Sequence, residues 1–175
     1  FPEIDIFLDL KLHDIPNTVA GASASVSDLS PRFLTVHAAG GADMVKAAVE
    51  KLPQTSITAV TVLTSLNPEE LAHLSLPTDT ENLAVALARR AISAGATSIV
   101  CSPHEASLMR TTLGASVNII TPGVRLEESQ KDDQQRVMTP KAAISQGANY
   151  VVVGRPITKA PHPGEMAAAI KHSLS

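Results

Sequence analysis

The sequence has a single cysteine and no strong excess of either charge. Cys101 is the only cysteine among 175 residues, and the formal net charge is -3. One cysteine excludes an internal disulfide framework and fits a reducing compartment. The small net charge provides no basic field for nucleic acid or an anionic membrane, whereas a small anionic metabolite needs only local positive groups. We therefore expect neither a nucleic-acid partner nor a membrane partner.

Long apolar runs are also absent. None approaches the roughly 20 residues that a membrane-spanning helix needs, and the chain does not open with a charged-then-apolar signal. These absences favour a cytoplasmic protein. The apolar run SIVCS surrounds Cys101, so we expect a buried, inert thiol rather than a nucleophile.

The length and the apolar content are enough for one core. Hydrophobic residues make up 44% of the 175 residues, which supports one substantial core and is short for two domains. We predict a single domain over residues 1–175. The chain starts at Phe1, without an initiator Met and close to an apolar strand, so we expect that something upstream has been removed.

Short apolar or β-branched runs alternate with Ala-rich stretches along the chain. Strands are predicted over residues 4–10, 33–36, 57–63, 98–102, 117–121 and 150–153, and helices over 18–29, 42–52, 80–93, 105–113, 140–146 and 164–174. This alternation predicts an α/β fold with a parallel sheet covered by helices. The pattern leaves open whether the sheet is doubly wound or forms most of a (β/α)8 TIM barrel. In both, ligands bind at the carboxyl ends of the strands.

The predicted helix ends carry matching signals. Gly95, Gly114 and Gly147 stand where a helix must stop, and glycine takes the left-handed conformation of a helix C-terminus without steric cost. Thr139 and Pro140 form a good N-cap and first-turn pair.

Charged residues gather at the end of the first predicted strand, in FLDLKLHDIPNT. Asp9 and Lys11 are two residues apart, so a regular strand directs both side chains to one face. A carboxylate beside the amine favours the ammonium form, which suits Lys11 to donate a proton rather than to form a Schiff base. The alternative is a structural ion pair at a strand end. The position at a carboxyl end and the second acid, Asp14, favour a functional site.

Two later segments have features of a phosphate site. In VVVGRP, Gly154 allows close approach to backbone N–H groups and Arg155 adds a planar charged fork; the alternative is a turn glycine beside a surface arginine. The long polar segment TPGVRLEESQKDDQQR has a length typical of functional or disordered loops. Its Arg125 and Gln134 are candidates to fold over a phosphate.

The run DLKLHDIPNT resembles the signature of the orotidine 5'-monophosphate decarboxylases, and VHAAGG, VTVLTS, TPGVR, DQQR and VVGRPIT resemble later blocks of that family in the same order. The resemblance covers essentially the whole chain. It implies a (β/α)8 barrel that functions as a homodimer, with the six predicted strands as the third to the eighth. It implies conversion of orotidine 5'-monophosphate (OMP) to UMP and CO2 in pyrimidine biosynthesis, without metal or organic cofactor.

The resemblance also assigns catalytic roles. Lys11 would protonate C6 of the pyrimidine, Asp9 would hold Lys11 in place and lie near the departing carboxylate, and Asp14 would reach into the partner subunit's active site. The family's charged tetrad begins with a lysine on the second strand. That lysine, and an early aspartate that contacts the ribose, have no counterpart here, so we do not expect full activity from these residues alone.

The substrate contacts implied by the resemblance fall into two groups. The signature run contributes Asp9, Leu10, Lys11, Leu12, His13, Asp14, Ile15, Pro16, Asn17 and Thr18. Thr64 would hydrogen-bond the pyrimidine, and Arg125, Gln134, Gly154 and Arg155 would bind the 5'-phosphate. His13 and His37 lie near the same rim, and we assign neither a catalytic role, since a histidine at a strand end is commonly a hydrogen-bonded structural residue.

Two alternatives stay open. A 3-keto-gulonate-6-phosphate decarboxylase-like enzyme shares the barrel and an acid-x-Lys-x-x-Asp signature but needs magnesium; the DIPNT continuation and the PGVR-to-DQQR loop argue against it. A non-catalytic phosphate-binding barrel is the other, because two strands of the barrel are missing from the sequence.

Overall fold

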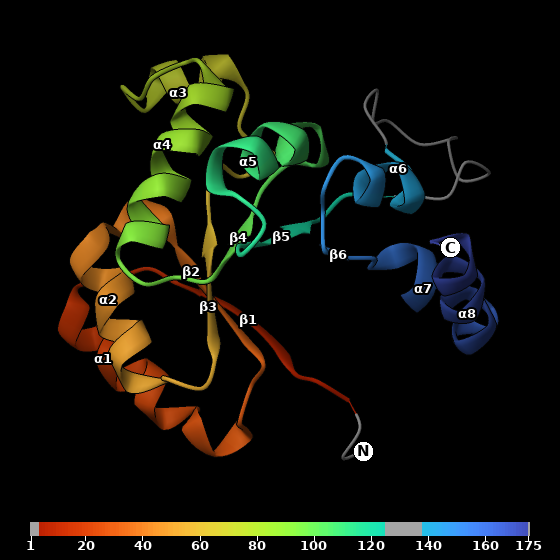
Figure 1. The fold of residues 1–175 in the computed structure, drawn as a ribbon, viewed down its shortest axis with the longest axis horizontal. Coiled ribbons are helices and arrows are strands. Elements are labelled where there is room, and N and C mark those ends of the chain that lie inside the picture. Colours follow the sequence, from red (N-terminus) through yellow and green to blue (C-terminus); the bar gives the residue numbers. More distant parts are fainter. Residues whose placement is uncertain (1–3, 125–137, 175) are drawn as a thin grey trace. The chain divides into compact units, whose positions relative to one another are not determined.

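The computed structural model of the chain describes residues 4–124 and 138–174. Its elements divide into two compact units, residues 1–100 and residues 101–175 (Figure 1). Each unit has its own parallel strands and helices. The single barrel domain expected over residues 1–175 stays a prediction.

The first unit contains four strands with helices between them. In chain order its elements are β1 (Phe7–Leu12), α1 (Pro16–Ser25), β2 (Phe33–His37), α2 (Ala42–Lys51), β3 (Ser56–Val60), α3 (Pro68–His73), α4 (Thr80–Ser93) and β4 (Ser98–Val100). The strands are parallel and lie in the order β1-β2-β3-β4. Short 3-10 turns, Ser27–Leu29 and Ala38–Gly40, follow α1 and β2.

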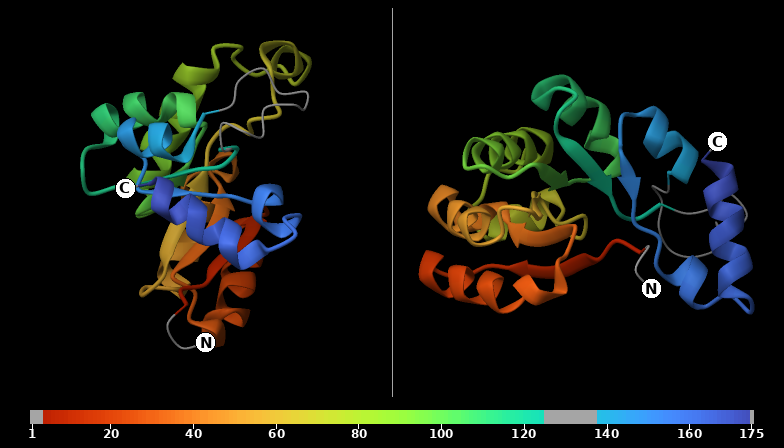
Figure 2. Two further views of the ribbon diagram at one scale, coloured as in Figure 1. Left: turned by 90° about the vertical axis from the view of Figure 1, so that its right-hand side faces the viewer. Right: turned by 60° about the horizontal axis from the view of Figure 1, so that its bottom comes forward.

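The core of this unit lies between the sheet and its helices. Leu34 and Val36 of β2 and Ile57 of β3 pack with Val19 of α1 and Met44 of α2, all at most 1% exposed. The right-hand view of Figure 2 shows α1, α2 and α4 next to one another along one side of the strands. Because side chains alternate along a strand, the residues between these core positions face the opposite side of the sheet.

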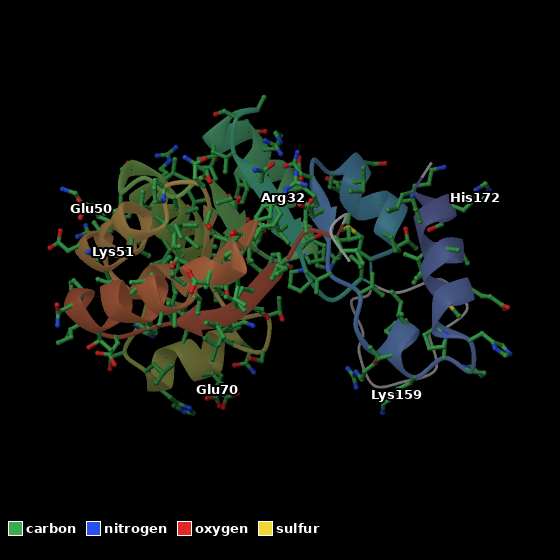
Figure 3. All side chains as sticks on the ribbon, turned by 90° about the horizontal axis from the view of Figure 1, so that it is seen from below. Arg32, Glu50, Lys51, Glu70, Lys159 and His172 are labelled. Atoms are coloured by element: carbon green, nitrogen blue, oxygen red, sulfur yellow. The ribbon has the colours of Figure 1, made fainter. Side chains whose placement is uncertain are left out.

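The charged residues on the helices of this unit point outward. Glu50 and Lys51 at the end of α2 and Glu70 on α3 are exposed and extend away from the core (Figure 3). The apolar and charged faces of the helices thus follow the usual amphipathic division.

The second unit contains the remaining βα elements. They are a 3-10 turn (Pro103–Glu105), α5 (Ala106–Leu113), β5 (Asn118–Thr121), α6 (Pro140–Ser145), β6 (Tyr150–Val151), α7 (Arg155–Thr158) and α8 (Pro163–Ser173). β5 and β6 are parallel. Ile119 and Ile120 of β5 and Ala143 of α6 are buried, each at most 1% exposed.

The predicted elements are present, with different boundaries. Each predicted strand has a counterpart, but the last one shortens to Tyr150–Val151. The first helix begins at Pro16, earlier than predicted, because proline fits the first helical position. The short helices α3 and α7 were not predicted.

The predicted helix-end signals are confirmed. Gly95, Gly114 and Gly147 all have positive φ, and the Thr139 Oγ1 accepts a hydrogen bond from the N–H of Ala142 at 3.2 Å. No described helix is long and apolar enough to cross a bilayer.

Cys101 is buried, as predicted. Burial, together with the nearby Glu105 carboxylate, raises the pKa of its thiol. The thiolate is therefore disfavoured, and the prediction of an unreactive thiol is supported.

Candidate active site

The first predicted constellation forms an ion pair at the end of β1. The Nζ of Lys11 lies 2.6 Å from Oδ2 of Asp9, and the two side chains are 42% and 45% exposed. At this exposure an ion pair contributes only about 0–1 kcal/mol to stability. The pair therefore contributes little to folding stability.

The backbone that carries this pair is not a regular strand. Leu8 is paired with Leu34, but Leu12 is paired with Val36. Residues 9 to 11 of β1 therefore stand opposite the single residue Thr35 of β2. Bulges of this kind disrupt the ladder and redirect side chains, and they are frequent beside active sites.

Lys11 absorbs most of this irregularity. Its φ is +49°, in the left-handed region, which is unfavourable for a residue with a Cβ by about 1–2 kcal/mol. The prediction that Asp9 and Lys11 meet is confirmed, but simple alternation along a regular strand is not the reason. The bulge brings the lysine side chain back to the aspartate.

Thr35 fills the gap that the bulge leaves in the ladder. Its hydroxyl accepts a hydrogen bond from the backbone N–H of Lys11 at 2.9 Å and donates one to Oδ1 of Asp9 at 2.8 Å. The residue is fully buried. Sequence reasoning missed it because its importance depends on the strand register, which no motif in LTVH indicates.

The rest of the signature run forms an open surface between β1 and α1. Asp14 is exposed, and its Oδ1 accepts a hydrogen bond from the N–H of Ile15 at 2.7 Å. Pro16 then begins α1, while Leu10 and Ile15 are 47% and 66% exposed. Asn17 and Thr18 are exposed in the first turn, and Leu12 and His13 lie between them and the ion pair in sequence.

Two histidines lie beside this surface. The rings of His13 and His37 pack against each other with centroids 5.1 Å apart. Burial lowers the pKa of His37, and the positive charges of His13 and Lys11 lower it further, against the opposing effect of Asp9. His37 is therefore disposed to be neutral near pH 7. Ring packing is a contact that the structure gives for both histidines.

Thr64 lies past the end of β3, in a turn before α3, and is exposed. Its neighbour Thr61 is only 4% exposed and donates its hydroxyl to the carbonyl of Val100 at 3.0 Å. Of the two threonines, Thr64 is the one open to a ligand.

The predicted phosphate residues Gly154 and Arg155 lie in the second unit, where β6 leads into α7. A Cβ built on Gly154 would meet no described atom within 4 Å, so the space next to this backbone is open. Arg155 is exposed at the first position of α7. Arg125 and Gln134, the other two predicted phosphate ligands, lie outside the described residues.

The described residues contain no group of three or more His, Cys, Asp or Glu side chains placed to hold a metal ion. The groups that the structure does bring together are an ammonium, a carboxylate and a buried hydroxyl. Such a set can position and transfer a proton.

Comparison with known proteins identifies a family. The model of the "Orotidine 5'-phosphate decarboxylase / HUMPS family" matches residues 2–170. An orotidine 5'-phosphate decarboxylase from Thermobifida fusca (strain YX) is 55% identical over 172 residues, which are 98% of this chain and 74% of the relative. One from Frankia casuarinae is 52% identical over 171 residues, 98% of this chain and 62% of the relative.

Solved structures agree in fold. The crystal structure of orotidine 5'-phosphate decarboxylase from Lactobacillus acidophilus superposes with a TM-score of 0.85 at 36% identity, over 98% of this chain and 75% of that one. The enzyme from Pyrococcus horikoshii OT3 gives 0.77 at 26% identity, over 98% and 74%. The α/β fold of parallel strands thus matches about three quarters of each of these two structures.

Proposed function

Because this chain belongs to the orotidine 5'-phosphate decarboxylase / HUMPS family and covers 74% of a relative's length, we propose that it forms the greater part of a longer enzyme, the full-length protein, that converts OMP to UMP and CO2 in pyrimidine biosynthesis. The observation that carries the proposal is the Asp9–Lys11 ion pair at the carboxyl end of β1, in the signature run by which the chain resembles the decarboxylases. Both curated relatives described above are named for this activity.

The proposed reaction breaks the bond between C6 of the pyrimidine and its carboxylate. The electron pair stays on C6, CO2 leaves, and the ammonium of Lys11 delivers a proton to C6 as or after the carbanion forms. Asp9 holds Lys11 and faces the departing carboxylate. Fixed charges that stabilise developing charge without reorganisation are the main source of rate in such sites.

The other end of the substrate is assigned to the second unit. We propose that Gly154 and Arg155, together with Arg125 and Gln134, bind the 5'-phosphate, and that Thr64 hydrogen-bonds the pyrimidine. The open space at Gly154 supports close approach of a phosphate to the backbone. Binding energy from this remote group can be used to stabilise the reactive arrangement.

The proposal includes the architecture of the active protein. The six strands correspond to the third to the eighth of a (β/α)8 barrel forming one domain. The protein is a cytoplasmic homodimer in which Asp14 of each subunit reaches the other's site, and catalysis needs no cofactor. The exposed Asp14 carboxylate at the start of α1 supports this role.

Replacement of Lys11 tests the proposed chemistry. In the full-length protein, Lys11→Ala should lower decarboxylation by at least about 100-fold, the lower range for removal of a positioned acid, because no group replaces the ammonium at C6. UMP binding should change little, since the phosphate is remote. Single-turnover CO2 release and calorimetric UMP titration measure the two effects.

The matched control is Lys51→Ala, which removes an exposed lysine at the end of α2 and should leave both quantities unchanged. CO2 release by Lys11→Ala at nearly the original rate would refute the assignment. Loss of the original activity in a chelator would favour the magnesium-dependent alternative.

A further inference from the structure

We propose that Thr35 is a positioning residue for the Asp9–Lys11 pair, acting on the reaction through both groups. The inference deepens the proposed function and rests on it for its kinetic consequence. The residue lies on β2, outside the signature run. The evidence for its role is the strand register and its hydrogen bonds.

The hydroxyl of Thr35 connects the backbone of one charged residue to the side chain of the other. It accepts the N–H of Lys11 at 2.9 Å and donates to Oδ1 of Asp9 at 2.8 Å, while Oδ2 of the same carboxylate receives the Lys11 ammonium at 2.6 Å. A hydroxyl has one hydrogen to donate, and here it goes to the carboxylate. The three residues therefore form a closed ring of hydrogen bonds.

The bulge explains why the backbone of Lys11 takes part in this ring of hydrogen bonds. Residues 9 to 11 stand opposite Thr35 alone, so the N–H of Lys11 takes a side-chain acceptor where a regular ladder would supply a carbonyl. The positive φ of Lys11 is unfavourable and persists only if its surroundings hold it. The Thr35 hydroxyl is the contact that holds the N–H in this conformation.

Thr35 is itself fixed by the sheet. It is fully buried, and its neighbours Leu34 and Val36 are fully buried in the core. β2 pairs in unbroken register with β3 over its whole length, from Phe33–Ser56 to His37–Val60. The ion pair is nearly half exposed, so a rigid, buried anchor supplies the order that its own solvent-exposed side chains lack.

The register also provides a matched control. Thr58 of β3 is the direct partner of Thr35 and is likewise fully buried. Its hydroxyl donates only to the carbonyl of Ser56, at 3.2 Å, among the contacts that the structure gives for it. Thr→Val at the two positions removes the same hydroxyl from the same row of the sheet, and only one of them touches the charged pair.

The experiment compares Thr35→Val, Thr35→Ser and Thr58→Val in the full-length protein. For Thr35→Val we expect kcat to fall roughly 10- to 100-fold, the scale seen when a group that orients catalytic ligands is lost, with KM changing less than about threefold because the phosphate contacts remain. Thr35→Ser keeps the hydroxyl and should restore most of the rate. Thr58→Val should match the original protein.

A second readout does not need turnover. In protein labelled with 13C at the lysine ε-carbons, the Lys11 resonance at one fixed pH should move in Thr35→Val, because its carboxylate partner is no longer held, and should stay in place in Thr58→Val. If the original protein shows no decarboxylation, the proposed function fails, while this resonance still tests the positioning.

An unchanged kcat and an unchanged Lys11 resonance in Thr35→Val would overturn the proposal, as would equal losses of kcat in Thr35→Val and Thr58→Val. If Thr35→Val does not fold, Thr35→Ala removes the hydroxyl with less bulk and is judged by the same two measurements.

Discussion

Lys11 combines a disfavoured backbone conformation with an ion pair of small stabilising value. Its φ of +49° costs about 1–2 kcal/mol, and a pair this exposed returns at most about 1 kcal/mol. A residue selected for stability alone would avoid both. This balance at Lys11 supports the proposed role of its ammonium in the reaction.

At the phosphate end, Arg155 permits a test with two ligands. Arg155→Ala should weaken UMP binding by roughly 1.5–3 kcal/mol, the scale of a hydrogen bond to a charged group, because the guanidinium fork is lost. Uridine lacks the phosphate and should bind as before. Calorimetric titration of both ligands measures the difference.

Lys159→Ala serves as the control, since Lys159 is an exposed cation at the end of the same short helix. Equal weakening of UMP and uridine by Arg155→Ala would make Arg155 a structural residue rather than a phosphate ligand.

At the scale of elements, the side chain of Arg110 connects several segments of the second unit. The guanidinium of Arg110 on α5 donates to the carbonyls of Gly114 at 2.7 Å, Val117 at 2.8 Å and Gly147 at 2.9 Å. It also donates to the Asn149 side chain, which in turn accepts the N–H of Ile119. One guanidinium thus donates hydrogen bonds to the end of α5, the segment before β5 and the turn between α6 and β6.

Arg110→Ala should therefore destabilise the second unit by about 2 kcal/mol, because several acceptors lose their donor and water replaces only some of them. Tyr150 on β6 is the only tyrosine and tryptophan is absent, so tyrosine fluorescence during urea unfolding reports on the neighbourhood of Asn149. A change within about 0.5 kcal/mol, as expected for the exposed Lys141→Ala, would show that the network is dispensable.

The elements differ in how far the sequence predicts them. The βα order is predicted from the apolar runs and the glycine-terminated helices, and the structure confirms it. The Ser102–Glu105 capping box likewise has a local signal in the sequence, the S-x-x-E spacing. The bulge in β1 and the contact with Thr35 depend on the pairing of two strands, which local patterns do not encode. The charged residues of the site were therefore predictable, and the residue that orients them was not.

At the scale of the whole molecule, the chain matches 74% of the length of its Thermobifida fusca relative. Within the part of the chain that the structure describes, β1 pairs only with β2. Ile6, directly before β1, and Leu10 within it are 41% and 47% exposed. An unpaired strand edge that carries apolar side chains invites association with other chains.

We therefore predict that a polypeptide of residues 1–175 alone self-associates and lacks decarboxylase activity. The unpaired edge of β1 accounts for the association, and the inactivity is expected from the resemblance to the decarboxylases, which implies a further tetrad lysine outside residues 1–175. Size-exclusion chromatography, thermal unfolding and a UMP-formation assay would compare this polypeptide with a version extended to the length of the Thermobifida fusca relative. The extended version should be a discrete dimer that unfolds cooperatively. If residues 1–175 alone gave a monodisperse, cooperatively unfolding and active protein, six strands would suffice, and the assignment of these strands to an eight-stranded barrel would be wrong.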